Sequence, residues 1–131
     1  MARQFKGEPG RLELEVMHIV WQKDETSVRE VLKEINKDRD LAYTTIMTTM
    51  KNLEQKGYLT HREEERVFIY RALVKKEEIE SSMLNNLVNT VFKGSFTRLV
   101  NQLIKNDSLS TDQVKDLLAS IEHEKAQKEN T

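Results

Sequence analysis

The chain has 131 residues, or about one compact unit at roughly 150 residues per domain, and it contains no cysteine, which excludes disulfides, thiolate metal sites and cysteine nucleophiles. Hydrophobic residues make up 37% and charged residues 33% of the chain, so it can bury only a thin core by itself and a partner surface is favoured. The formal net charge of −1 excludes attraction to nucleic acid or to an anionic membrane by overall charge, so such binding would need a local patch.

No targeting or membrane-spanning segment is evident. The opening residues contain no apolar stretch of signal-peptide length. The densest apolar run, residues 16–21, is far shorter than the roughly 18 residues that a spanning helix needs. We therefore expect a soluble cytoplasmic protein without membrane insertion.

Two helices are predicted before residue 36. After a loop at residues 7–10, one apolar stripe recurs at helical spacing, made of Leu12, Val16, Met17, Val20 and Trp21. Residues 24–26 form a short polar break. Ser27 and Glu30 then fit a capping box that closes the start of a second helix. That helix is lined by Val28, Val31, Leu32 and Ile35, and a charged connector follows at residues 36–40.

The segment at residues 42–56 has conflicting signals. Its many β-branched side chains suit a strand. However, Ile46, Met50 and Leu53 fall at i, i+4 and i+7, and Gly57 stands where a helix C-cap is expected. The periodicity therefore predicts a helix.

A hairpin follows, and then more helices. Residues 58–62 and 67–71 are two short β-prone runs, joined by a link at residues 63–66 that lacks Gly and Asn. The chain after residue 73 is predicted to form three amphipathic helices, of which the third begins with a capping box at Ser110 and Gln113. From about residue 122 we expect a polar tail that frays. The apolar stripes of the three helices contain Ile79, Met83, Leu84, Leu87, Val88, Val91 and Phe92, then Phe96, Leu99, Val100, Leu103 and Ile104, then Val114, Leu117, Leu118 and Ile121.

Catalysis finds little support in the sequence. The four glycines do not form a phosphate-binding loop, and His18, His61 and His123 share no metal-ligand spacing. We read these histidines as surface, strand and tail residues. The sequence predicts no enzyme, no metal site and no cofactor.

The order of three helices and a hairpin is typical of a winged helix-turn-helix, in which the second helix of the motif enters the major groove of DNA. Here that helix is residues 42–56, whose polar face offers Thr44, Met47, Thr48, Lys51 and Gln55. Four threonines in an exposed or half-exposed helix cost about 2 kcal/mol relative to alanine, which favours a functional role. The alternative is a solvated helix face that happens to be rich in threonine.

The charges of this lobe are balanced. The hairpin contains Arg62, Arg66 and Arg71, which can reach phosphates, but residues 63–65 are all glutamate. Residues 1–73 hold 13 basic and 13 acidic side chains. Affinity for DNA must therefore come from placed residues. A helical protein-interaction adaptor, in which the same surfaces bind a protein, is the alternative from another class.

Several motifs together resemble the BlaI/MecI penicillinase-repressor family over roughly residues 10–125. The stretches that carry the resemblance are Leu12-x-x-Glu15-Val16-Met17-x-Ile19-Val20-Trp21, residues 27–32, Tyr43-Thr44-Thr45-Ile46-x-Thr48, Leu53-x-x-Lys56-Gly57-Tyr58-Leu59, Phe68-Ile69-Tyr70, and Phe92-x-Gly94 with Leu99-Val100.

The resemblance implies a mainly α fold with a small β-hairpin wing: a winged-helix DNA-binding lobe at residues 1–73 and a helical dimerisation lobe at residues 74–131. It implies a homodimeric repressor that binds an inverted repeat of TACA/TGTA half-sites, with recognition helices about 34 Å apart. A membrane sensor that triggers proteolysis is a further implied partner. The expected dimerisation residues are Leu84, Leu87, Val88, Val91, Phe92, Phe96, Leu99, Val100, Leu103, Ile104, Val114, Leu117, Leu118 and Ile121.

The sequence departs from the family pattern at several positions. Copper-responsive relatives have Cys-x-Cys pairs that this chain lacks, Gln102-Leu103 replaces the cleaved Asn-Phe bond, Asn52 replaces a frequent arginine, and the wing tip is acidic. The candidate DNA-binding residues are Thr44, Thr45, Met47, Thr48, Lys51 and Asn52, with Arg62 and Arg66 as phosphate contacts.

Overall fold

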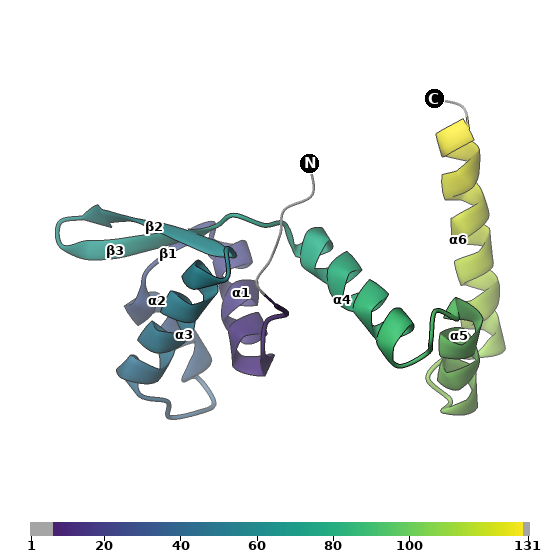
Figure 1. Ribbon diagram of the computed structural model, residues 1–131, viewed down its shortest axis with the longest axis horizontal. Helices are drawn as coiled ribbons and strands as arrows, with labels where there is room; N and C mark the ends of the chain where they lie inside the picture. Colours follow the sequence, from purple (N-terminus) through teal and green to yellow (C-terminus); the bar gives the residue numbers. More distant parts are fainter. Residues whose placement is uncertain (1–6, 130–131) are drawn as a thin grey trace. The chain divides into compact units, whose positions relative to one another are not determined.

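The computed structural model describes residues 7–129, which form six helices and one three-stranded sheet (Figure 1). The predicted class, mainly α with a β hairpin, is confirmed. Contacts within the chain divide it into two units after Met83, and each is described by itself below. The elements are α1 (Arg11–Lys23), β1 (Glu25–Thr26), α2 (Val28–Ile35), α3 (Tyr43–Gln55), β2 (Leu59–Glu64), β3 (Val67–Ala72), α4 (Lys76–Thr90), α5 (Phe96–Lys105) and α6 (Thr111–Glu129).

The core of the N-terminal unit confirms the helical interpretation of residues 42–56. Ile46, Met50 and Leu53 have no exposed surface and pack in one cluster with apolar residues of α1, α2 and the sheet. Thr49 also faces inward, and its hydroxyl donates a hydrogen bond of 2.7 Å to the carbonyl of Thr45. The expectation of four exposed or half-exposed threonines was therefore wrong for Thr49, whose hydroxyl is satisfied by its own helix.

Local capping fixes where the helices begin and end. Gly57 has a φ of 91°, and its neighbour Tyr58 donates its amide to the carbonyl of Leu53 at 2.9 Å, which ends α3 in a Schellman motif. The Ser27 hydroxyl accepts the amide of Glu30 at the start of α2. At the start of α6 both bonds of the predicted capping box form, because Ser110 and Gln113 each bind the backbone amide of the other.

The sheet contains a strand that the sequence did not reveal. Residues 24–26, interpreted as a polar break, include the two-residue strand β1, which pairs antiparallel with β3 and gives the order β1-β3-β2. Thr26 is buried there, with 1% of its surface exposed. A strand this short has no alternating pattern to detect, so the interpretation as a break was wrong.

The hairpin is tighter than expected. β2 runs to Glu64 and pairs with β3 from Val67, so only Glu65 and Arg66 form the tip. Their φ angles are +50° and +69°, as a two-residue type I′ loop requires. This conformation favours Asn and Gly, and a side chain at either position is strained. In Figure 1 the tip extends beyond helices α1–α3.

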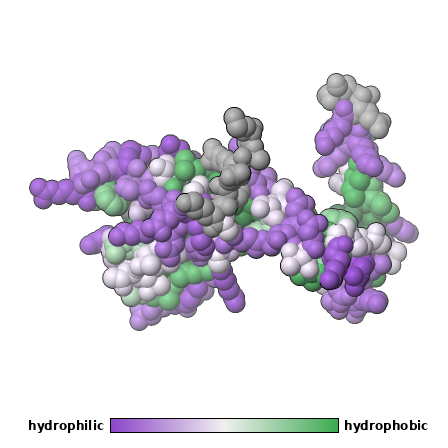
Figure 2. All heavy atoms as spheres, in the orientation of Figure 1, coloured by the Kyte–Doolittle hydropathy of each residue, from purple (hydrophilic) through white to green (hydrophobic). Residues whose placement is uncertain are grey.

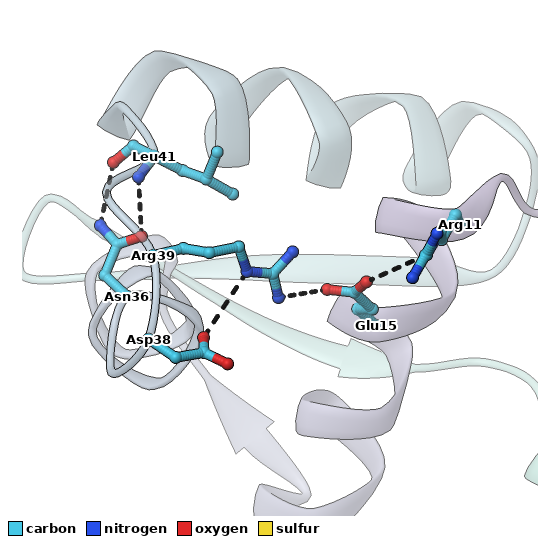
Figure 3. Close-up of polar contacts among 6 residues, drawn as sticks. All are labelled: Arg11, Glu15, Asn36, Asp38, Arg39 and Leu41. Carbon is cyan, nitrogen blue, oxygen red and sulfur yellow. Dashed lines mark hydrogen bonds and ion pairs between the residues drawn. The ribbon is translucent and has the colours of Figure 1, made fainter.

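The turn between α2 and α3 is closed by side chains (Figure 3). The amide group of Asn36 donates to the carbonyl of Leu41 at 2.9 Å, and its oxygen accepts the amide of Leu41 at 2.8 Å. Arg39 pairs with Asp38 and with Glu15 on α1, which also contacts Arg11. These contacts fix the direction in which α3 leaves the turn.

The junction between the sheet and α4 belongs to the N-terminal core. Val74 and Ile79 are buried in that core, and Met83 packs against it. The indole N–H of Trp21 on α1 donates to the carbonyl of Val74 at 2.9 Å. The division into lobes after residue 73 stays a proposal about which segments bind DNA and which dimerise.

The C-terminal unit is helical and leaves its apolar side chains largely uncovered. No residue of α5 is buried, and Val88 is the most buried of the predicted dimerisation residues, with 8% of its surface exposed. The expectation of a frayed tail from residue 122 was wrong, because α6 continues to Glu129. Within this part of the helix, Gln127 and His123 contact each other one turn apart. Within the described residues, no helix has the length and apolarity to cross a membrane.

Candidate nucleic-acid interface

The polar face of α3 lies at the surface, as predicted. Met47 is half-buried, because it packs at the margin of the core. No side chain caps the helix at Ala42, and no acidic residue lies in its first turn, so the positive end of the helix dipole is not neutralised locally. The exposed members of the face are Thr44, Thr45, Thr48, Lys51, Asn52 and Gln55.

A groove of about 430 Å³ runs between this helix, the start of α2 and the wing. Tyr43, Val67 and Phe68 are large apolar or aromatic side chains that stay 41–48% exposed there. Among the described residues that line the groove, three are cations and none is acidic. The lining consists of Ser27, Val28, Arg29, Tyr43, Met47, Lys51, Arg66, Val67, Phe68 and Tyr70.

The three groove cations lack the ion pairs that Arg11, Lys37, Arg39, Lys56 and Arg62 make in the same unit. Within residues 7–129, Arg29, Lys51 and Arg66 have no ion-pair partner. Arg62, in contrast, pairs with Glu25 on β1 and with Glu64, and the hydrogen bond with Glu25 is the main reason that the pKa of Arg62 is raised. A chain with balanced charge thus has uncompensated positive charge in the groove.

The predicted DNA-binding residues therefore lie in different parts of the surface. Met47, Lys51 and Arg66 meet in the groove. Asn52 instead borders a second, open hollow of about 450 Å³, beside the ion pair of Lys56 with Glu13 at 2.7 Å. Thr44, Thr45 and Thr48 lie on the exposed face of α3 but do not line the groove, and Arg62 is held in its own ion pairs.

Sequence reasoning missed Arg29 and Tyr43. Arg29 stands inside the capping sequence at residues 27–30, where the motif explains Ser27 and Glu30 and leaves Arg29 without an assigned role. Tyr43 is the first residue of α3 and is 44% exposed. Neither position has a local signal, because the groove exists only once α2, α3 and the wing are assembled.

Behind the groove, His61 on β2 connects the wing to α3. Its Nδ1 lies 2.7 and 2.9 Å from the two carboxylate oxygens of Glu54, and its ring stacks on Phe68 with centroids 4.2 Å apart. Tyr70 is a further ring neighbour at 5.3 Å. Burial raises the pKa of the Tyr70 phenol above its usual value.

The predicted dimerisation residues other than Val88 are half-buried or exposed. Within the described part of the chain, no group of three His, Asp or Glu side chains is placed to hold a metal ion. Phe92, Leu99, Val100 and Val114 are half-buried. The remaining members, exposed by 37–59%, are Leu84, Leu87, Val91, Phe96, Leu103, Ile104, Leu117, Leu118 and Ile121.

Comparisons with known proteins agree with this geometry. The sequence model of a family described as penicillinase repressor matches residues 9–123. The methicillin resistance regulatory protein MecI of Mammaliicoccus sciuri is 33% identical over 105 residues, which cover 80% of this chain and 85% of that protein. The penicillinase repressor of Bacillus licheniformis is 30% identical over 116 residues, covering 88% and 91%. The solution structure of the DNA binding domain of the repressor BlaI is similar with a TM-score of 0.50 and 32% identity, covering 60% of this chain and 93% of that domain.

Proposed function

The chain belongs to the penicillinase repressor family, and we propose that it is a dimeric transcriptional repressor that occupies an inverted-repeat operator in double-stranded DNA. The relatives that it matches are named as repressors and regulatory proteins, and the matched solution structure is that of a DNA-binding domain. The proposed function includes no catalytic role. Its action is to exclude transcription from the DNA that it covers.

The observation that carries the proposal is the acid-free groove beside the polar face of α3. A helix of this kind fits the major groove, where hydroxyl and amide groups reach base edges. Arg29, Lys51 and Arg66 come from three different elements and converge on one hollow without carboxylate partners. Phosphates are the complementary ligand, and the apolar wall between the cations suits the sugar of the same strand.

The exposed apolar residues of α5 and α6 support the dimer. Figure 2 shows apolar surface, in green, along α6. Covering a Leu, Ile, Val or Phe side chain contributes about 1.5–3 kcal/mol, so leaving the six exposed ones of α5 and α6 in water is costly. A two-fold contact between identical units covers each stripe with its own copy and matches the symmetry of an inverted repeat.

Titration with salt tests DNA binding directly. A duplex pool of random sequence is titrated first, and the duplex that the protein selects from it is titrated next. We expect the logarithm of the association constant to fall linearly with the logarithm of the salt concentration, because bound phosphates release counterions. Absence of duplex binding at low salt would instead favour the protein-interaction adaptor.

Substitutions then separate phosphate contacts from base contacts. Lys51→Ala and Arg66→Ala should each lower the salt slope by about one, whereas Thr48→Ala should weaken binding to the selected duplex without changing that slope. Lys23→Ala, on exposed α1 surface outside the groove, is the matched control. Unchanged affinity in both Lys51→Ala and Thr48→Ala would remove α3 from the DNA surface.

A further inference from the structure

The wing and α3 form opposite sides of the groove, so its width depends on what holds them together. The wing side includes Phe68, and the α3 side includes Met47 and Lys51. Phe68 is 41% exposed, and it stacks on His61. His61 in turn contacts Glu54, one turn beyond Lys51 on α3. Besides the core packing of Tyr70 against α3, a chain of ring and polar contacts through His61 thus connects both sides of the groove.

We propose that His61 and Glu54 are a positioning pair that sets the distance between the wing and α3 for the DNA strand in the groove. The inference rests on the proposed function, since the pair matters only if DNA occupies the groove. Neither residue lines the groove, so both act through the residues that do. His61 places Phe68 by stacking, and Glu54 anchors His61 to the helix.

The link between the wing and α3 depends on both side chains of the pair. Both carboxylate oxygens of Glu54 contact the Nδ1 of His61, and the ring of His61 stacks on Phe68. The other groups that face His61 are Tyr70 from β3 and, on its own strand, Glu63, which lies on the same side of the sheet. A glutamine in place of His61 loses the stacked ring, and a glutamine in place of Glu54 loses the carboxylate that holds the ring.

Anisotropy titrations of the duplex that the wild-type protein selects test the pair in the full-length protein. We expect His61→Gln and Glu54→Gln each to bind this duplex about tenfold more weakly than the wild type. The double variant pairs two neutral amides, so it should bind no more weakly than either single variant. His123→Gln, on exposed α6, should bind as the wild type does.

The outcomes separate this proposal from the one on which it rests. If Glu54→Gln keeps the affinity of the wild type while His61→Gln does not, His61 contacts DNA itself and the positioning role is overturned, as it is if both single variants match the wild type. If the wild type binds no duplex, both the proposed DNA binding and the positioning role of His61 and Glu54 are overturned. Hydrogen exchange in the free protein adds a DNA-independent measurement: the single variants should exchange faster in the strands β2 and β3, and equal exchange counts against the pair.

Discussion

The two units of the chain use apolar side chains in opposite ways. In the N-terminal unit, α1, α2, α3 and the sheet cover one another, and Val16, Met17 and Leu53 have no exposed surface. In the C-terminal unit, the helices leave apolar side chains such as Leu118 and Ile121 half exposed. A regular apolar stripe in the sequence thus predicts a buried face, but it does not identify what buries that face. The first unit covers its apolar faces within one chain, and we propose that a second copy covers those of the second unit.

Removal of the C-terminal unit should have the largest effect. A fragment ending at Met83 keeps the whole core, including Val74 and Ile79, and should be a folded monomer. We expect its affinity for the selected duplex to fall by on the order of 100-fold, because the second half-site no longer binds intramolecularly. Analytical ultracentrifugation and a duplex titration measure both properties.

A fragment ending at Leu73 is the matched comparison, since it also lacks Val74 and Ile79. It should remain monomeric and folded but unfold at lower urea concentration than the longer fragment. A dimeric fragment, or one that binds DNA as tightly as the full chain, would contradict the assignment of the dimer interface to the C-terminal helices.

A pair of leucine substitutions tests the contrast at single side chains. Leu53→Ala removes a fully buried side chain of α3 and should lower the free energy of unfolding by about 2–5 kcal/mol at any protein concentration. Leu118→Ala, in contrast, removes a side chain of α6 that is 55% exposed in the single chain. It should raise the dimer dissociation constant by about tenfold and lower stability only at concentrations where the dimer forms. Equal, concentration-independent losses would erase the distinction between the two units.

The sequence was most informative where periodicity and capping agree. The spacing of Ile46, Met50 and Leu53, with Gly57 at the end, outweighed the strand propensity of the threonines, because tertiary burial decides between the two. It was least informative where structure arises from assembly. β1 has only two residues, and the groove brings together Arg29, Lys51 and Arg66 from parts of the chain that share no local motif.

The wing tip offers a smaller test of the N-terminal unit. Glu65→Asn places a residue that tolerates positive φ in the type I′ loop and should raise the free energy of unfolding by about 0.5–1 kcal/mol. Arg66→Gly should stabilise the hairpin as well, yet weaken duplex binding, because it removes a groove cation. Urea unfolding and duplex titration of the two variants distinguish these effects; destabilisation by Glu65→Asn would count against a strained tip.

We expect no proteolytic cleavage within α5. Exposure of the full-length protein to a resistance-type sensor protease should leave the Gln102–Leu103 bond intact, because the Asn-Phe pair of the cleaved repressors is replaced there. The bond also lies within α5, whose helical backbone does not present the extended form that proteases bind. Mass spectrometry would reveal a fragment ending at Gln102 if this expectation is wrong.

Because the indole of Trp21 donates a hydrogen bond to the carbonyl of Val74, the intrinsic fluorescence of the protein reports on this contact. Trp21 is the single tryptophan, and its indole N–H contacts the backbone where the chain leaves the sheet for α4. Indole emission shifts to longer wavelength when water replaces a protein carbonyl at this N–H. Opening of the junction, whether by heat, by proteolysis or by a bound partner, thus changes the colour of the emitted light without any attached dye.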